Sequence, residues 1–324
     1  MRKRYDGQRA LNSQLKAVVR SSVHMLLEPV ERRLLDQRES ESTPPCFILG
    51  APRSGTTLLY ELLVTYYEFS YFTNLANMFY LTPLAVSKLA NNFKKNWHGN
   101  QKSSFGSIKG IGAPSEAGNL WGRWIPEFGY LDEHDAAARK SLLNESVKVI
   151  YAMQKLHQAP FINKNVMHGV HIRLLDMAYP GCLFIDLRRD IKANVRSIVR
   201  ARKKGGGPPL GSDGWWSVRP RNVERWCGLS MEEQACAQVI MLRKDVEDAF
   251  ASIGQERRII VNYEDICRQP KLHMELIVDF LKPVCGGLKR RNSFESEIDL
   301  SPSSLLSDEA EERVASALAT LEMT

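Results

Sequence analysis

The chain has 324 residues, of which 44% are hydrophobic and 25% charged, a composition typical of a globular protein that can bury its own core. Its formal net charge of +7 favours an anionic ligand. The basic residues are dispersed and do not alternate with aromatic ones, which argues against nucleic acid as a partner. The six cysteines stand singly, without the paired spacing of a zinc site or a disulfide framework, so we expect no metal.

No segment of the sequence reaches the roughly 18 uncharged apolar residues that span a bilayer. The N-terminal stretch MRKRYDGQRALNSQ is basic, but no apolar run follows it, so it differs from a secretory signal. We therefore expect a cytoplasmic protein without a membrane span, and the sequence leaves a homodimer open.

The first predicted element is an amphipathic helix from Asn12 to about Leu35, within an N-terminal segment of residues 1–42. Its apolar residues recur mostly at steps of three and four: Leu15, Val18, Val19, Val23, Leu26, Leu27, Val30 and Leu34. We expect a bend at Pro29. Because an apolar stripe normally faces a core, we expect this helix to pack on its own domain rather than on a membrane or a partner.

Residues 43–284 predict one α/β domain. Short apolar runs predict strands over Cys46–Leu49, over Gly181–Leu187 and around Ile259–Val261, and a helical pattern follows the first two. Strands that alternate with helices form a mainly parallel sheet with both faces covered. The predicted fold class is therefore α/β, in three α/β/α layers.

Two later stretches depart from this pattern. Residues 203–222 are rich in Gly and Pro and contain Trp215 and Trp216, and a loop of this length is typical of a lid or binding loop. These rings, like that of Trp226, either cover a ligand or plug the loop. Residues 285–324 are predicted to form a polar tail that ends in a helix from Asp308.

The loop after the first strand has the sequence GAPRSGTT, from Gly50 to Thr57. It keeps both glycines of a phosphate-binding loop but has Thr56 where nucleotide triphosphatases have lysine. Backbone N–H groups at the start of the following helix favour an anion, and Arg53 adds a positive charge. A loop without the lysine is badly equipped for γ-phosphoryl transfer, but it is well equipped to bind one terminal phosphate-like group.

A second motif, LRRDIKANVRS, places Arg189 at the end of a strand and Ser197 on the helix that follows. Side chains at the carboxyl ends of parallel strands lie where an open α/β sheet binds ligands. We therefore expect this pair to bracket a further phosphate, although Arg189 alone is equally consistent with a residue that caps the sheet.

Together these stretches resemble the sulfotransferases that use 3′-phosphoadenosine-5′-phosphosulfate (PAPS). GAPRSGTTLL is similar to that family's 5′-phosphosulfate loop, and LRRDIKANVRSIV to its 3′-phosphate motif. The stretches FINKNVMHGVHIRLLDMAYPGCLFIDLRRD and IIVNYEDICRQPKLHMELIVDFL also resemble family segments, so the likeness runs from about Pro45 to Leu281. It implies a P-loop-like fold and metal-free transfer of a sulfuryl group to an acceptor hydroxyl or amine, with 3′,5′-adenosine bisphosphate (PAP) as the other product.

The resemblance also implies roles for single residues. It implies that the 5′ end of PAPS is bound by the loop residues Arg53, Ser54, Gly55, Thr56 and Thr57. It implies that the 3′-phosphate is bound by Arg189 and Ser197. Lys164 matches the family's lysine before a helix and is expected to stabilise the bridging oxygen as it leaves, with Arg53 as a second catalytic cation.

The general base is less well marked. Relatives carry a glutamate soon after the loop helix, but here Glu68 comes early and Asn74 stands near the expected place. Glu116, in GAPSEAGNLWGRW, lies in a stretch suited to an acceptor pocket, and we prefer it. The alternatives are Glu68 and, in the stretch VMHGVHI, His168 and His171.

The acceptor is a carbohydrate, a lipid or a small metabolite, on family analogy alone. Two other functions stay open: a P-loop kinase or nucleotidase, and a nucleotide-binding scaffold that has lost its activity. The departure from the family's glutamate favours the scaffold, whereas Thr56 argues against the kinase.

Overall fold

The computed structural model describes residues 2–36, 43–97, 99, 108–125, 129–205, 214–292 and 305–322. Its strands are β1 (Cys46–Leu49), β2 (Ile162–Lys164), β3 (Leu183–Arg188) and β4 (Arg258–Asn262). The α-helices are α1 (Arg2–Leu35), α2 (Thr56–Tyr66), α3 (Asn74–Met78), α4 (Pro83–Leu89), α5 (Asn91–Lys95), α6 (Gly118–Trp124), α7 (Glu133–Arg139), α8 (Asn144–His157), α9 (Ile172–Ala178), α10 (Ile191–Gly205), α11 (Met231–Ile253), α12 (Tyr263–Arg268), α13 (Pro270–Cys285) and α14 (Asp308–Glu322).

The four strands form one parallel sheet in the order β2-β1-β3-β4. All of its described pairs are parallel, so the carboxyl ends of the strands lie at one edge. The predicted α/β class is confirmed. The strand that was expected from Gly181 begins two residues later, because Gly181 adopts a φ of +85° in the preceding turn.

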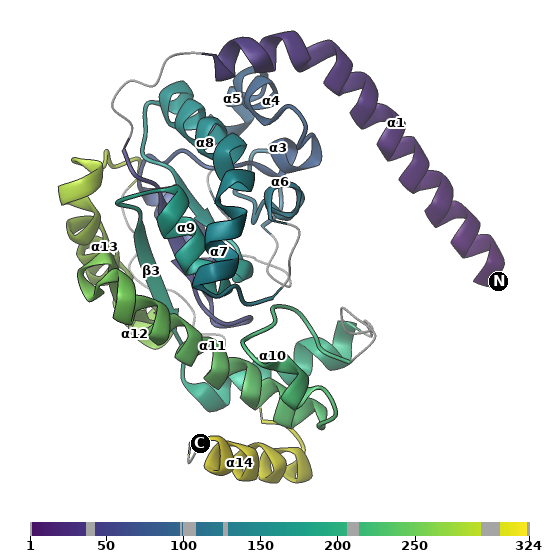
Figure 1. Ribbon diagram of the computed structural model, residues 1–324, viewed down its shortest axis with the longest axis vertical. Coiled ribbons are helices and arrows are strands. Elements are labelled where there is room, and N and C mark those ends of the chain that lie inside the picture. Colours follow the sequence, from purple (N-terminus) through teal and green to yellow (C-terminus); the bar gives the residue numbers. More distant parts are fainter. Residues whose placement is uncertain are drawn as a thin grey trace.

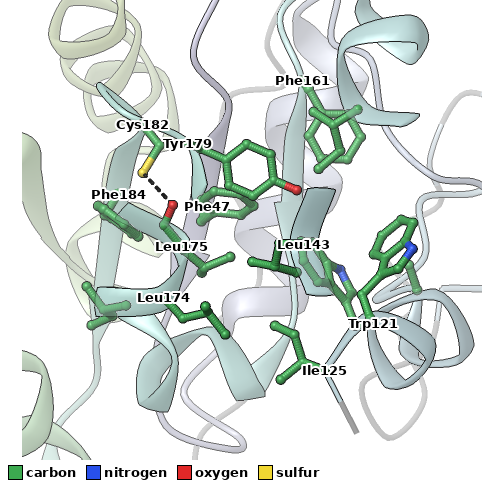
Figure 2. Close-up of a cluster of buried hydrophobic side chains, with 14 of the residues drawn as sticks. Phe47, Trp121, Ile125, Leu143, Phe161, Leu174, Leu175, Tyr179, Cys182 and Phe184 are labelled. Carbon is green, nitrogen blue, oxygen red and sulfur yellow. Dashed lines mark hydrogen bonds between the residues drawn. The ribbon is translucent and has the colours of Figure 1, made fainter. Parts of the chain in front are cut away.

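Alternate side chains of β1 and β3 enter different cores, which is why both strands begin with a continuous apolar run. Phe47 and Phe184 point into a core shared with α8, α9 and α11. Figure 2 shows these two rings beside Tyr179 and Leu175. Ile48 and Ile185 point into the opposite core, which α2, α12 and α13 cover. The sheet is therefore the middle of three layers (Figure 1).

The helix predicted near the N-terminus is α1, which begins ten residues earlier than expected and continues through Pro29. Glu31 fixes its C-terminal half, because its carboxylate accepts hydrogen bonds from the amides of Leu84 (3.2 Å) and Ala85 (2.7 Å) at the start of α4. Burial raises the pKa of this carboxyl to about 7. The N-terminal half of α1 extends away from the domain (Figure 1).

The expectation that the apolar stripe of α1 packs on its own domain is wrong in part. Val23, Leu27, Leu34 and Leu35 are half-buried, but six large apolar residues of the helix are exposed: Leu15, Val18, Val19, Met25, Leu26 and Val30. The spacing of three and four residues marked a helix correctly, but it merged two different faces into one stripe.

The helix expected from Asp308 is present as α14 and packs on α10 and α11 through Val314, Leu318 and Leu321. Arg196 of α10 donates to Glu311 from Nε (2.8 Å) and from Nη2 (2.7 Å). This bidentate ion pair fixes the orientation of α14 on α10, in addition to the apolar contact. None of the helices in the described ranges is long and apolar enough to cross a bilayer.

Part of the predicted loop of residues 203–222 is helical, since α10 continues to Gly205, and residues 206–213 lie outside the described ranges. Trp215 is buried with α10 and α11 around it, and its indole N–H donates to the carbonyl oxygen of Val218 (2.9 Å). Of the two interpretations of this ring, the structure supports the plug. Trp216 and Trp226 pack against the same core while half-buried.

Candidate active site

The loop from Gly50 to Gly55 joins the carboxyl end of β1 to the start of α2. Gly50, Arg53 and Gly55 all have positive φ values, of 152°, 65° and 104°. These turns reverse the chain so that α2 begins directly over the sheet edge. No side chain caps the helix at Gly55, so its first amides stay available for an anion.

Both glycines are required by close contacts. A Cβ at Gly55 would lie 2.2 Å from Cδ2 of Tyr263, and a Cβ at Gly50 would lie 2.8 Å from the carbonyl oxygen of Leu187. The loop is therefore held between β3 and the start of α12, with no room for a side chain at either position.

We expect Gly55→Ala to lower the stability of the fold by about 1–3 kcal/mol, because it adds both a clash and a backbone conformation that L residues rarely adopt. Gly122→Ala is the matched control, since its Cβ would meet nothing within 4 Å and alanine stabilises a helix interior by roughly 0.5–1 kcal/mol. Thermal unfolding of the two variants checks this expectation. Equal melting temperatures would contradict the tight loop geometry.

Ser54 lies at the centre of the loop. Its side chain is buried, and within the described part of the chain its Oγ has no hydrogen-bond partner. Thr56 and Thr57 follow it and are buried too. A buried hydroxyl without a partner is costly, so this arrangement fits a ligand that brings hydrogen-bond acceptors into the loop.

Arginines gather beside the loop. Arg189 donates from Nη1 to the carbonyl oxygen of Arg53 (3.1 Å), and its guanidinium lies 4.5 Å from the ring centre of Tyr263. Burial lowers the pKa of the Arg53 guanidinium, and the charges of Arg189 and Arg200 lower it further. The pKa of Arg200 is also lowered, by burial first and then by Arg189 and Arg196. The positive charges of these arginines repel one another, so a bound anion would be stabilised beside them.

Helix α10 carries the rest of the second motif. Asp190 caps it by accepting from the amide of Ala193 (2.8 Å), and Asn194 donates from Nδ2 to the carbonyl oxygen of Pro52 (2.7 Å). Ser197 comes one turn after Asn194 and so lies on the same face of the helix, where it is half-buried. The fold thus brings the GAPRSGTT loop and the Arg189–Ser197 motif together.

Lys164 ends β2 and pairs in register with Ile48 of β1, which brings its side chain to the same sheet edge as the loop. Only 4% of this side chain is exposed. Its Nζ donates to Oγ1 of Thr57 (3.3 Å) and forms an ion pair with the carboxylate of Glu116. The predicted lysine, the loop helix and the preferred base therefore meet at one point.

The segment around Glu116 is fixed to β2. Asn163 donates from Nδ2 to the carbonyl oxygen of Ser115 (3.1 Å), and Asn165 donates to that of Glu116 (3.0 Å). Ala117 follows with a φ of 56° and directly precedes α6. The Glu116 side chain is 35% exposed, so it can meet an acceptor while it contacts Lys164.

The other candidates for the base lie elsewhere. His168 is buried against Phe47 and contacts Oδ1 of Asn163 through Nε2 (2.9 Å). Its pKa is held well below its usual range, by burial first and then by the charges of His171 and Lys164. His171 is buried as well and donates to the carbonyl oxygen of Gly129 (3.0 Å).

Glu68 is exposed and follows the C-terminal end of α2, whereas the loop lies at the N-terminal end of that helix. An 11-residue helix separates the two ends by about 16 Å. Asn74 donates to the carbonyl oxygens of Ile108 (2.7 Å) and Gly110 (2.8 Å), which is a structural role. Among these residues only Glu116 contacts Lys164.

Sequence reasoning did not assign four residues of the site: Asn194, Arg200, Arg243 and Tyr263. Asn194 lies inside the motif LRRDIKANVRS, Arg200 follows that motif, and Tyr263 begins the stretch YEDI, so their neighbourhood was visible but their contacts were not. Arg243 donates to the carbonyl oxygen of Arg189 from the middle of α11. No local pattern marks that contact.

Within the described ranges, no group of three or more His, Cys, Asp and Glu side chains is arranged as metal ligands. A narrow cleft lies behind the loop at the ends of β1 and β3, lined by Gly50, Asp186, Arg188, Asn194 and Arg243 among others. Arg188, Arg189 and Arg243 all line this cleft, so the cleft extends the cationic edge at Arg189.

Comparisons with known proteins agree with this geometry. A model of the sulfotransferase family matches residues 44–283. The solved structure of the sulfotransferase STF9 from Mycobacterium avium is 18% identical, with 92% of this chain and 72% of that chain covered and a TM-score of 0.51. At this identity the likeness shows the fold alone.

Two further solved structures are similar over long stretches. The sulfotransferase domain from the curacin biosynthetic pathway is 20% identical, with 75% of each chain covered and a TM-score of 0.41. STF1 from Mycobacterium tuberculosis H37Rv is 14% identical, with 94% of this chain and 80% of that chain covered and a TM-score of 0.45. Comparison with curated proteins finds no match. Since the family model covers most of its length, the chain belongs to the sulfotransferase family.

Proposed function

We propose that this protein transfers the sulfuryl group of PAPS to a hydroxyl or amine of a carbohydrate, lipid or small-metabolite acceptor. The observation that carries the proposal is the group of arginines beside a lysine-free phosphate-binding loop. The loop fits one anionic group. Next to it, the positive charges of Arg53, Arg189 and Arg200 repel one another. PAPS supplies two anionic ends, whereas a nucleoside triphosphate lacks the one at the 3′ position.

The loop is assigned to the 5′ end of the donor. Backbone amides at the start of α2 bind sulfonate and phosphate oxygens, and the buried hydroxyl of Ser54 gains the partner that it lacks. Thr57 lies within reach of both this loop and Lys164. PAPS supplies an activated sulfuryl group at this point, and the chain supplies positive charge around it.

The 3′-phosphate is assigned to Arg189 and Ser197, with Arg200 as an additional cation. Tyr263 lies against the Arg189 guanidinium and limits its freedom. Arg189 also bonds to the loop backbone, so one residue links the two halves of the donor site.

Lys164 and Glu116 are assigned to the chemistry. Glu116 accepts the proton of the acceptor hydroxyl as the acceptor oxygen forms its bond to sulfur. Lys164 stabilises the negative charge on the oxygen that bridges sulfur and phosphorus as that bond breaks. The ion pair between these two residues keeps the cation close to the loop and the carboxylate close to the cation.

Calorimetry with PAP, compared with ATP and Mg²⁺, tests the donor class. We expect PAP to bind at least tenfold more tightly, because the cationic site beside the loop matches its 3′-phosphate and a charge-assisted hydrogen bond contributes about 1.5–3 kcal/mol. Tight binding of ATP with Mg²⁺, with no preference for PAP, would support a P-loop kinase or nucleotidase. Transfer from radiolabelled PAPS into acceptor pools then separates an enzyme from an inactive scaffold that binds the same nucleotide.

Arg189→Ala is expected to weaken PAP binding by roughly 10- to 100-fold, since one or two charge-assisted bonds are lost. Binding of AMP, which has no 3′-phosphate, should change little. Arg225→Ala is the control, because Arg225 is an exposed arginine on the short helix at Val223–Trp226. An equal loss of affinity for AMP and PAP would mean that Arg189 only supports the loop.

A further inference from the structure

The outer face of α1 is apolar and has no cover in the described part of the chain. Its exposed residues, here called the outer stripe, are Leu15, Val18, Val19, Met25, Leu26 and Val30. Leu15 is 61% exposed, and Leu26 is 77% exposed. The helix also has an inner face, on which Arg20, Val23, His24, Leu27 and Glu31 are at least half-buried.

Helix geometry places the two faces on opposite sides. At 3.6 residues per turn, Leu15 and Leu26 point within about 20° of each other, while Glu31 points about 160° away from Leu15. Glu31 contacts α4, and Arg20 lies over the ring of Tyr80 at 5.4 Å. Because the inner face is fixed to the domain, the outer stripe cannot turn inward to bury itself.

A row of this kind is unusual on a surface. Single exposed apolar residues are common, but six of them on one face along four turns mark a surface that another molecule covers. The outer stripe is separate from the candidate active site, because no residue of the stripe contacts the loop or Lys164 among the contacts described.

Charge indicates what covers the stripe. Residues 2–19 of the sequence contain five basic residues, Arg2, Lys3, Arg4, Arg9 and Lys16, and one acidic residue, Asp6. Two copies of the helix paired in parallel would bring these like charges together. Ser22 and Pro29 also interrupt the stripe at positions where a paired helix needs apolar side chains. A basic helix with one apolar face is instead suited to an anionic lipid surface.

We propose that α1 binds the protein to anionic membranes, with the outer stripe at the boundary of the acyl chains and the net positive charge of the N-terminal half of the helix as the attraction to the head groups. The helix lies along the surface and does not cross it. Glu31 and its bonds to α4 attach the domain firmly to this helix. The proposal is independent of the donor and acceptor of the reaction.

The experiment is flotation of the full-length protein with vesicles of phosphatidylcholine alone or of equal parts phosphatidylcholine and phosphatidylglycerol. We expect binding to the anionic vesicles, weakened by salt because surface charges are screened. Leu15→Asp combined with Leu26→Asp should reduce the partition coefficient by on the order of tenfold or more, since two anchoring side chains become anionic. Lys16→Glu should reduce it by a smaller factor.

Leu305→Asp is the matched control, because Leu305 is 72% exposed just before α14, at the other end of the molecule in Figure 1. It should bind as the wild type does. PAP binding by the double variant shows that the domain is still folded. Equal binding of the wild type and the double variant to vesicles overturns the proposal. So does a wild-type dimer, seen by light scattering without lipid, that the double variant converts to a monomer.

Discussion

Lys164→Ala is expected to lower the rate of sulfuryl transfer by about 10²–10³-fold, the usual loss when one donor to a developing negative charge is removed from a preorganised site. Lys164 is the buried cation that contacts both α2, through Thr57, and Glu116. Its charge counts most when the bridging oxygen becomes negative, so the rate should fall much more than the affinity for PAP. Radiolabelled transfer and calorimetry on the same protein preparation measure both quantities.

Lys155→Ala is the control for the loss of a lysine, since Lys155 is exposed on α8 away from the loop. Lys164→Arg tests geometry as well as charge, because a guanidinium keeps the charge but spreads it over a larger plane. A Lys164→Ala enzyme that turns over within a few-fold of the wild type would remove Lys164 from the mechanism. A large loss of PAP affinity with the rate unchanged would make it a binding residue only.

The sequence alone was enough for the parts of the fold whose signals are local. β1, β3 and β4 were visible because each contains a continuous apolar run. In β1 and β3 the run reflects burial on both faces, since their side chains enter two cores. β4 is buried only in part, and its Ile260 is 44% exposed. The loop was visible because its two glycines and the hydroxyl residues stand at a spacing that few other structures need. Asp308 was visible as a helix start because acidic residues follow it in the first turn.

The sequence did not predict β2 as a strand, although the stretch that contains it resembles the family segment that carries the lysine. Two of its three residues are polar, Asn163 and Lys164, and both are buried. Asn163 is acceptable there because its amide makes tertiary hydrogen bonds to Trp121 (2.8 Å) and Ser115 (3.1 Å). A buried polar strand follows no period of hydrophobic residues, so only the fold explains it.

The arrangement of the site shows the same limit. The motifs predicted which residues belong to it, but the contact of Arg189 with Tyr263 and the bond from Asn194 to the loop join elements far apart in the chain. The exposed outer stripe of α1 was hidden for a similar reason. Spacing shows that a helix has an apolar face, but only the packing of α4 shows which face is covered.

Glu116→Gln is expected to lower the rate of transfer by roughly 10²–10⁴-fold, the contribution of a positioned general base. PAP affinity should change much less, because Glu116 contacts the donor site only through Lys164. Glu309→Gln is the control: this glutamate is 81% exposed and pairs with Arg313 on its own helix. A wild-type rate in Glu116→Gln would move the base to another residue.

The ion pair with Lys164 gives Glu116 a second way to affect the rate, and the acidity of the acceptor hydroxyl separates the two. If Glu116 takes the proton, the loss of rate in Glu116→Gln should be much smaller for an acidic hydroxyl, such as that of a phenol, than for an alcohol, because an acidic hydroxyl needs less help from a base. If Glu116 only positions Lys164, the loss should be about the same for both acceptors, since Lys164 acts on the leaving oxygen. His168 offers no third explanation, since it is 1% exposed and burial holds its pKa well below the usual range. A loss in Glu116→Gln that shrinks as the acceptor becomes more acidic is therefore the result that supports proton transfer to this carboxylate.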